Sequence, residues 1–228
     1  ETVATNILGG VNILEILKGK SKIKSAVMIA TDKVYENKET KISFKEESPL
    51  GGTDIYSASK ACSEIIVNAY RSSFFKNTKI NIGSARSGNV IGGGDWTLDR
   101  IVPDCLSSFS KNKELTIRYP KSIRPWQHVL EPLYGYLLLA EKLHSHRGAN
   151  FSQAWNFGPK LENNTNVYEL AKKLKKITKS KSKIITSKLK NFSEAKYLYL
   201  DSSKSMKLLK WKKILNLKQT LNLINDWH

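Results

Sequence analysis

A tyrosine and a lysine four residues apart are the sharpest chemical feature of this sequence. Tyr56 and Lys60 stand in the run Tyr-Ser-Ala-Ser-Lys, and in a helix this spacing places both side chains on one face. An ammonium group stabilises a neighbouring phenolate, and a phenolate can act as a general base. The same pair on an ordinary surface helix has no chemical role, so the surrounding residues must decide between the two interpretations.

Three polar residues follow an apolar run that predicts a buried strand over residues 25–30. They are Thr31, Asp32 and Lys33, and they offer a hydroxyl, an acid and a base in one place. Ligands of open parallel sheets bind at the carboxyl ends of the strands. The alternative is a turn in which Asp32 only caps the backbone.

A glycine-rich segment follows a second predicted strand, over residues 79–85. Three consecutive glycines at 92–94 would let backbone come close to a ligand, and Arg86 and Asn89 offer hydrogen-bond donors. The segment is not a Walker loop, because no Gly-Lys-Ser/Thr sequence follows the glycines.

Two further arginines have the setting of phosphate ligands. Arg124 is followed by a proline, and Arg100 precedes a predicted helix; a guanidinium group can grip a phosphate with two hydrogen bonds. A surface salt bridge is the alternative for each. His128 and Cys62 are interpreted as structural residues.

Strands alternate with helices along the chain, which predicts an α/β fold with a parallel sheet. We expect part of a Rossmann-like sheet, formed by residues 1–111, and a smaller mixed substrate-binding region in 112–228, some of which returns to the sheet. The remaining predicted strands span residues 115–118, 154–157 and 197–200. The predicted helices span residues 2–18, 55–75, 100–111, 132–144, 167–178, 203–209 and 218–227.

Composition narrows the classes of function. The net charge is +18 over 228 residues, and residues 172–228 contribute +13 of it, from sixteen lysines and three acidic residues. Base-reading proteins favour arginine, so a solvated lysine surface is preferred over nucleic-acid binding. Cys62 and Cys105 have no metal-ligand spacing and indicate a reducing, cytoplasmic compartment. No uncharged run is long enough to cross a membrane.

Taken together, these motifs resemble the extended short-chain dehydrogenase/reductase superfamily. Within it, the chain is similar to the CDP-glucose 4,6-dehydratases. Asp32-Lys33 separates this group from dTDP-glucose dehydratases, which have Asp-Glu there. The resemblance rests on five runs: Asn6-Ile-Leu-Gly9, Thr31-Asp-Lys-Val-Tyr35, Pro49 to Lys60, Ala85 to Trp96 and Arg124-Pro-Trp-Gln-His-Val129.

The resemblance implies a reaction and a cofactor: NAD-dependent conversion of CDP-glucose to its 4-keto-6-deoxy derivative and water, in deoxysugar and O-antigen biosynthesis. It makes Thr31, Asp32, Lys33, Tyr56 and Lys60 catalytic. The implied cofactor contacts are Tyr56, Lys60, Ala30 and Arg86, and the implied substrate contacts are Asn89, Arg100 and Arg124. No metal is implied.

One departure from the superfamily pattern concerns the cofactor. The glycine-rich turn that holds the NAD pyrophosphate is not found in these residues, so we expect an N-terminal segment of the Rossmann-like domain to be absent and the chain alone to be inactive. A full-length protein would form a homo-oligomer. The alternatives are another sugar-nucleotide epimerase or dehydratase, and a non-catalytic binding remnant.

Overall fold

Three parallel strands form the sheet at the centre of the molecule. The structure is a computed structural model that describes residues 1–19, 22–159, 164–187 and 197–228. The strands are β1 (Ser25–Thr31), β2 (Asn81–Ser87) and β7 (Ala154–Phe157), in the order β1-β2-β7. Parallel pairing aligns Thr31 with Ser87 at the carboxyl end, so residues that leave β1 and β2 emerge at the same edge.

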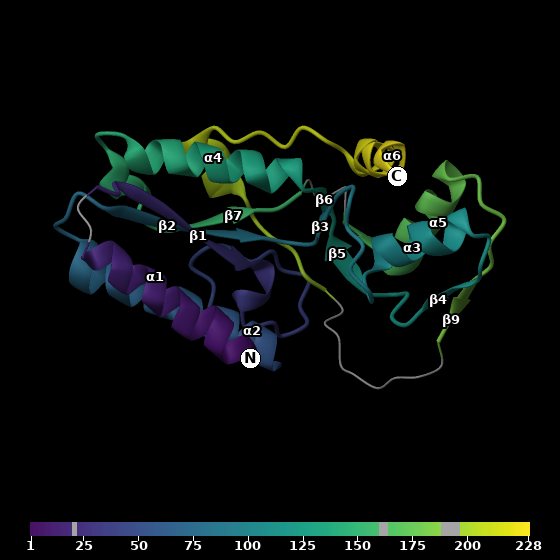
Figure 1. Cartoon of the computed structure of the whole chain (residues 1–228), viewed down its shortest axis with the longest axis horizontal. Coiled ribbons are helices and arrows are strands. Elements are labelled where there is room, and N and C mark those ends of the chain that lie inside the picture. Colours follow the sequence, from purple (N-terminus) through teal and green to yellow (C-terminus); the bar gives the residue numbers. More distant parts are fainter. Residues whose placement is uncertain (20–21, 160–163, 188–196) are drawn as a thin grey trace.

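Helices cover both faces of this sheet, as Figure 1 shows. On one face lie α1 (Gly9–Lys18), which continues the π-helical turn Ala4–Leu8, and α2 (Ile55–Tyr70), which runs into the π-helical turn Arg71–Phe75. On the other face lies α4 (Leu130–His144). The predicted α/β architecture with a parallel sheet is therefore confirmed.

Apolar side chains pack between these layers. On the α1 and α2 side the buried cluster is Leu14, Leu17, Val67, Phe75, Ile80 and Ile82. On the α4 side it is Ala85, Leu139, Leu143, Trp155, Phe157, Leu209 and Trp211. Because β2 contributes to both clusters, it is buried on both faces, as expected for a central strand of a parallel sheet.

A second lobe has its own apolar core. It contains α3 (Ile101–Ser110), α5 (Val167–Ile177) and α6 (Leu217–Trp227), with the parallel pair β4 (Leu115–Ile117) and β9 (Ile184–Thr186). Two short pairs lie where the lobe meets the sheet (Figure 1): β3 (Val90–Ile91) with β6 (Gln127–His128), and β5 (Ile123–Pro125) with β8 (Asn164–Asn166). The remaining short turns are Asp32–Val34, Gly148–Phe151 and Ser205–Leu209.

The chain passes between the two cores more than once. Helix α3 precedes the predicted boundary at residue 111 but packs against α5 in the lobe, whereas β7 follows that boundary and pairs with β2. The return of later segments to the sheet agrees with the expectation. The division into 1–111 and 112–228 stays a prediction.

The predicted strand over residues 197–200 is wrong. Only Leu200 makes a ladder contact, an isolated parallel bridge to Phe44. Leu198 and Leu200 are both buried. The apolar residues at every second position, which predicted a strand, therefore reflect burial against a loop, and no neighbouring strand in the described residues extends the pairing. No helix in the described ranges has the length and apolar character needed to cross a bilayer.

The edge of β1 generates a prediction about association. Within the described residues β1 pairs only with β2, and Ile29 is 53% exposed. Val3, Leu8, Ile13 and Ile16 on the helical segment before β1 are about as exposed. Unpaired strand edges and contiguous apolar surface both promote association. We expect the 228-residue polypeptide to self-associate, measured by sedimentation velocity at increasing concentration.

A charge on the strand should weaken this association. Ile29→Lys should shift the distribution toward monomer, whereas the matched control Ile42→Lys, on an exposed loop, should leave it unchanged. A single monomeric boundary at every concentration of the unmodified chain would contradict the prediction.

Candidate active site

Helix α2 carries the tyrosine and lysine of the sequence motif in its first two turns. The helix begins at Ile55 because the Asp54 carboxylate accepts hydrogen bonds from the backbone N–H groups of Tyr56 (2.9 Å) and Ser57 (3.0 Å). This is a standard N-terminal cap. Tyr56 is 43% exposed and Lys60 is half-buried, so Tyr56 is accessible to a ligand and is not a core residue.

Asp32 is a buried carboxyl group at the end of β1. Its side chain is 3% exposed. Oδ1 accepts a hydrogen bond of 3.0 Å from the Thr31 hydroxyl, while Oδ2 has no hydrogen-bond partner among the described residues. Burial raises the pKa of Asp32 to about 6, against the lowering effects of Thr31, Lys33 and Arg124. Asp32 therefore keeps a proton to higher pH than an ordinary aspartate, and its Oδ2 is enclosed without a described protein partner.

Backbone packs closely against that oxygen from the loop after β2. A Cβ added to Gly88 would lie 2.9 Å from Asp32 Oδ2 and 2.5 Å from Pro125 Cγ, so only glycine fits here. The neighbouring Arg124 is buried and donates a hydrogen bond of 2.8 Å to the carbonyl of Ile123. Its charge lowers the pKa of Asp32. The structure thus brings Arg124 beside Asp32.

The strand-end residues and the start of α2 lie together. The turn Asp32–Val34 packs against α2, and the Gly51 N–H donates to the Val34 carbonyl at 2.9 Å. The exposed Lys33 acts electrostatically on two carboxylates, since its charge lowers the pKa values of both Asp32 and Asp54. Thr31, Asp32 and Lys33 are therefore held near the helix turn that carries Tyr56.

A cavity lies between α1, α2 and β1, beside this group. Its volume is about 190 Å³, and Ala30 and Lys60 both line it. Ser63, Glu64 and Ser84 add polar atoms. The cavity could take a small polar portion of a larger ligand at the carboxyl end of β1.

Arg86 lies in a buried polar network behind the cavity wall. Its Nη2 donates to Glu64 Oε2 at 2.8 Å and its Nη1 donates to Tyr35 Oη at 2.9 Å. Burial lowers the pKa of Arg86, but the hydrogen bond and charge of Glu64 outweigh this effect and raise it overall. Both Nη atoms of Arg86 donate to protein groups and Nε has no partner among the described residues, so a contact between Arg86 and a cofactor stays a prediction.

Asn89 and Arg100 occupy less enclosed positions. Asn89 is half-buried, and its carbonyl accepts from the Gln127 N–H at 3.1 Å. Arg100 is exposed at the residue before α3 and its charge lowers the pKa of Asp95. The structure brings neither into a described contact with Asp32, and their substrate roles stay predictions.

The structure adds Tyr136 and Ser87 to the site, and no sequence motif assigned either residue a functional role. The two hydroxyls are 2.7 Å apart. Burial, and the charge of the nearby Asp32, raise the pKa of Tyr136, against the lowering effect of its bond to Ser87. Tyr136 lies in α4, on the opposite side of the sheet from α2, so only the folded structure could connect it with Asp32.

The three consecutive glycines have a packing role that the sequence did not reveal. A Cβ on Gly93 would lie 2.3 Å from Cγ of Trp227, and Gly94 has φ +74° beside the same ring. The glycines therefore let the indole of α6 sit against the loop. The close approach is to a protein side chain.

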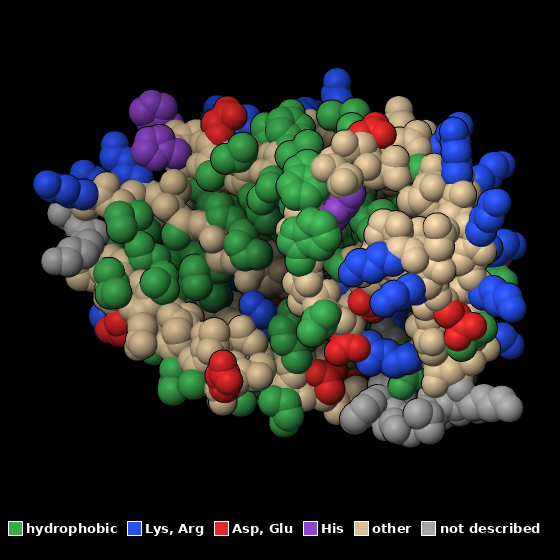
Figure 2. All heavy atoms as spheres, turned by 45° about the vertical axis from the view of Figure 1, so that its right-hand side comes forward, with side chains coloured by type: hydrophobic (Ala, Val, Ile, Leu, Met, Phe, Trp, Pro, Cys, Tyr) green, Lys and Arg blue, Asp and Glu red, His purple; other side chains and the backbone are tan. Residues whose placement is uncertain are grey.

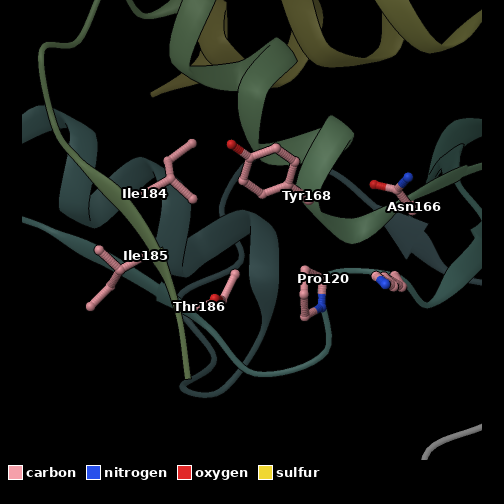
Figure 3. Close-up of a pocket in the computed structure, with 7 residues that line it drawn as sticks. Pro120, Asn166, Tyr168, Ile184, Ile185 and Thr186 are labelled. Carbon is pink, nitrogen blue, oxygen red and sulfur yellow. The ribbon is translucent and has the colours of Figure 1, made fainter. Parts of the chain in front are cut away.

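A groove in the lobe is a separate feature. It has a volume of about 640 Å³ and runs along β9, where the Tyr168 ring points toward Ile184 (Figure 3). Among the described residues that line it, Lys121 is the one charged group. Lysines gather on this side of the molecule (Figure 2), and five of them line an adjoining groove: Lys172, Lys175, Lys176, Lys179 and Lys183. Neither groove combines an acid with a base, so the candidate active site remains at Asp32.

Comparison with known proteins places the chain in a family. The profile of the GDP-mannose 4,6 dehydratase family matches residues 1–224. The chain belongs to this family. A relative from Salmonella typhimurium, named CDP-glucose 4,6-dehydratase, is 43% identical over the whole chain, which spans 65% of that relative's length. The dTDP-D-glucose 4,6-dehydratase of Dictyostelium discoideum is 32% identical over 49% of the chain and 27% of its own length.

Solved structures of family-like enzymes share the fold. A dTDP-glucose 4,6-dehydratase from Bacillus anthracis, solved in complex with NAD, superposes with a TM-score of 0.82 at 21% identity and covers 99% of this chain and 68% of its own. A UDP-glucuronic acid 4-epimerase from Bacillus cereus superposes with a TM-score of 0.85 at 21% identity, and the match covers 99% of this chain and 67% of the epimerase chain. At this identity the likeness establishes the Rossmann-like fold, which dehydratases and epimerases share.

The raised pKa of Asp32 generates a prediction about stability. A carboxyl group with a pKa of 3.8 in the unfolded chain and about 6 in the folded protein costs stability as the pH rises from about 4 to about 6, because folding then opposes ionisation. The full difference corresponds to about 3 kcal/mol. Asp32→Asn should therefore be more stable than the unmodified protein at pH 7.5 and similar to it at pH 4, measured by urea unfolding.

The matched control is Asp226→Asn, because Asp226 is exposed near the end of α6. This variant should show the same pH dependence as the unmodified protein. Equal loss of stability from pH 4 to pH 7.5 in Asp32→Asn and in the unmodified protein would show that Asp32 ionises normally.

Proposed function

We propose that the complete protein is an NAD-dependent CDP-glucose 4,6-dehydratase that forms CDP-4-keto-6-deoxyglucose and water. The observation that carries the proposal is Asp32: a buried carboxyl group, with one unpartnered oxygen and a pKa near 6, beside the helix of Tyr56 and Lys60. A 4-epimerase needs no acid for a leaving hydroxyl. The name of the Salmonella typhimurium relative supports the choice of a cytidine sugar nucleotide.

The first half of the reaction oxidises the sugar at C4. Tyr56, accessible at the start of α2, removes the proton of the 4-hydroxyl as a general base. Lys60, one helical turn further, favours the phenolate form through its positive charge. Thr31, at the end of β1, would hydrogen-bond the 4-oxygen. A bound nicotinamide cofactor would supply the hydride chemistry, with its oxidised form accepting hydride from C4 and its reduced form returning it to C6 after elimination.

The second half removes the 6-hydroxyl as water. A ketone at C4 acidifies the C5 proton, and Lys33 would either remove that proton as a base or orient the substrate at C5. Asp32 donates its proton to the departing 6-hydroxyl through the oxygen that is free of protein partners. Burial raises the pKa of Asp32 to about 6, so near neutral pH this carboxyl group is protonated more often than an ordinary aspartate, and the protonated form is the one that a general acid requires.

The residues of the chain fit one end of the cofactor. Lys60 and Ala30 line the cavity at the carboxyl end of β1, where dinucleotides bind in folds of this class, and they would hold the nicotinamide ribose. Arg124 would hold the substrate phosphates, with Asn89 and Arg100 as further contacts. We place the reaction in the cytoplasm, within deoxysugar synthesis for cell-surface polysaccharide, and we propose a homo-oligomer.

The length of the chain generates a prediction about activity. Within the described residues, no glycine-rich turn joins a strand to a helix in the manner that anchors a pyrophosphate. Each charge-assisted hydrogen bond to a ligand contributes about 1.5–3 kcal/mol. Loss of several such bonds therefore lowers the binding affinity for a dinucleotide by orders of magnitude. We expect no measurable dehydration of CDP-glucose by residues 1–228 alone, assayed as 4-keto-6-deoxy sugar nucleotide formed with NAD⁺ present.

A longer protein should be active. We expect turnover when the 228 residues are joined to the N-terminal segment of the Salmonella typhimurium relative, and we expect Tyr56→Phe to abolish it. Tyr70→Phe, on the same helix, is the control and should retain activity. Absence of product from the longer protein with CDP-glucose would overturn the proposed function.

A further inference from the structure

The proposed reaction needs groups on two separate elements to hold one spacing. Asp32 lies on the turn after β1, whereas Tyr56 and Lys60 lie on α2. The chain between them is a long loop, so covalent connection does not fix their separation. Oxidation at C4 uses the α2 residues and elimination uses Asp32, on the same sugar. Some interaction must therefore tie the two elements together.

Arg86 contacts both elements at positions close to the reacting groups. Glu64 lies four residues after Lys60 on α2, and its Oε2 accepts a hydrogen bond of 2.8 Å from Arg86 Nη2. Tyr35 lies three residues after Asp32, and its hydroxyl oxygen accepts a hydrogen bond of 2.9 Å from Arg86 Nη1. The planar fork of an arginine holds both partners in one geometry. Arg86 itself is fixed on the central strand β2.

The partners are buried and joined by several hydrogen bonds, and of their side-chain polar atoms Glu64 Oε1 and Arg86 Nε have no partner among the described residues. The side chains of Arg86 and Glu64 are 4% and 2% exposed. Glu64 Oε2 also accepts from the Ser84 hydroxyl at 2.9 Å. Tyr35 donates to Asn156 Oδ1 at 2.6 Å, and burial raises its pKa to about 12, so it stays neutral and keeps the proton that it donates. A displaced member would leave a buried charge or hydroxyl unpaired.

We propose that Arg86, with Glu64 and Tyr35, is a positioning unit that sets the distance between Asp32 and the Tyr56–Lys60 face of α2. This inference rests on the proposed function for the roles of the residues it positions. A buried ion pair contributes little net stability compared with apolar packing, whereas it specifies one arrangement. In this assignment Arg86 and Tyr35 touch neither sugar nor cofactor, and Glu64 borders the cavity proposed for the nicotinamide ribose.

The test is Tyr35→Phe in the longer protein, because it removes the hydroxyl link and keeps the ring and the Arg86–Glu64 pair. We expect the rate of dehydration to fall at least tenfold with little change in KM for CDP-glucose. Reduced cofactor should accumulate at 340 nm, since oxidation on α2 continues while elimination at Asp32 is slowed. Tyr70→Phe is the matched control: it removes a 2.6 Å hydrogen bond between the end of α2 and Glu15 of α1.

A second readout needs neither substrate nor cofactor. Amide hydrogen exchange should accelerate in the turn Asp32–Val34 and the first turn of α2, and remain unchanged in α4 and α5. If Tyr35→Phe yields little folded protein, Glu64→Gln, which keeps the size and an acceptor for Arg86, takes its place in both measurements.

The outcomes separate this inference from the proposed function. An unmodified longer protein that forms no product overturns the proposed function, while the exchange measurement still decides the positioning role. Unchanged exchange, or a variant with a lower melting temperature but normal turnover per folded molecule and no accumulation at 340 nm, overturns the positioning role.

Discussion

Folding removes the carboxyl groups of Asp32 and Glu64 from water. Neighbouring residues of the sheet must then supply the hydrogen bonds that water would otherwise make to these groups. Oε2 of Glu64 accepts hydrogen bonds from the Arg86 guanidinium and the Ser84 hydroxyl, both on β2. Asp32 receives one hydroxyl and keeps one oxygen without a partner, so its pKa rises. Residues on β1 and β2 thus give two different results: a buried Arg86–Glu64 ion pair, and a carboxyl group with a raised pKa at Asp32.

This difference follows from where each group lies along the strands. Glu64 faces the middle of β2, where Ser84 and Arg86 project toward α2, whereas Asp32 lies beyond the last paired residue of β1 and meets only Gly88 and the Arg124-Pro125 segment. Both sites leave a buried polar atom without a described partner, Oε1 of Glu64 and Oδ2 of Asp32, but only Glu64 has a guanidinium within hydrogen-bond distance. Ligands of open parallel sheets bind at the strand ends, which is where Asp32 lies.

Much of the sheet and the nucleus of the site were predictable from sequence. Local patterns specify β1, β2 and β7, and Tyr56, Lys60 and Asp32 carry their chemistry in their types and spacing. The short strands β3, β5, β6, β8 and β9 were missed, since pairs of two or three residues depend on a distant partner. Tyr136 and the links of Arg86 to Glu64 and Tyr35 were missed for the same reason: contacts across the sheet leave no periodicity in the chain.

The pairing of β2 with β7 has a consequence for how the chain is made. Ser84 pairs with Ala154, seventy positions later along the chain, and the intervening residues include α3 and β4 of the other lobe. A ribosome must therefore release α3 and β4 of the lobe, and α4, before the central strand gains its second neighbour. Until then β2 has one open edge, and contacts of such long sequence separation form slowly. The order of synthesis leaves the half-built sheet as the stage most dependent on chaperones during biogenesis.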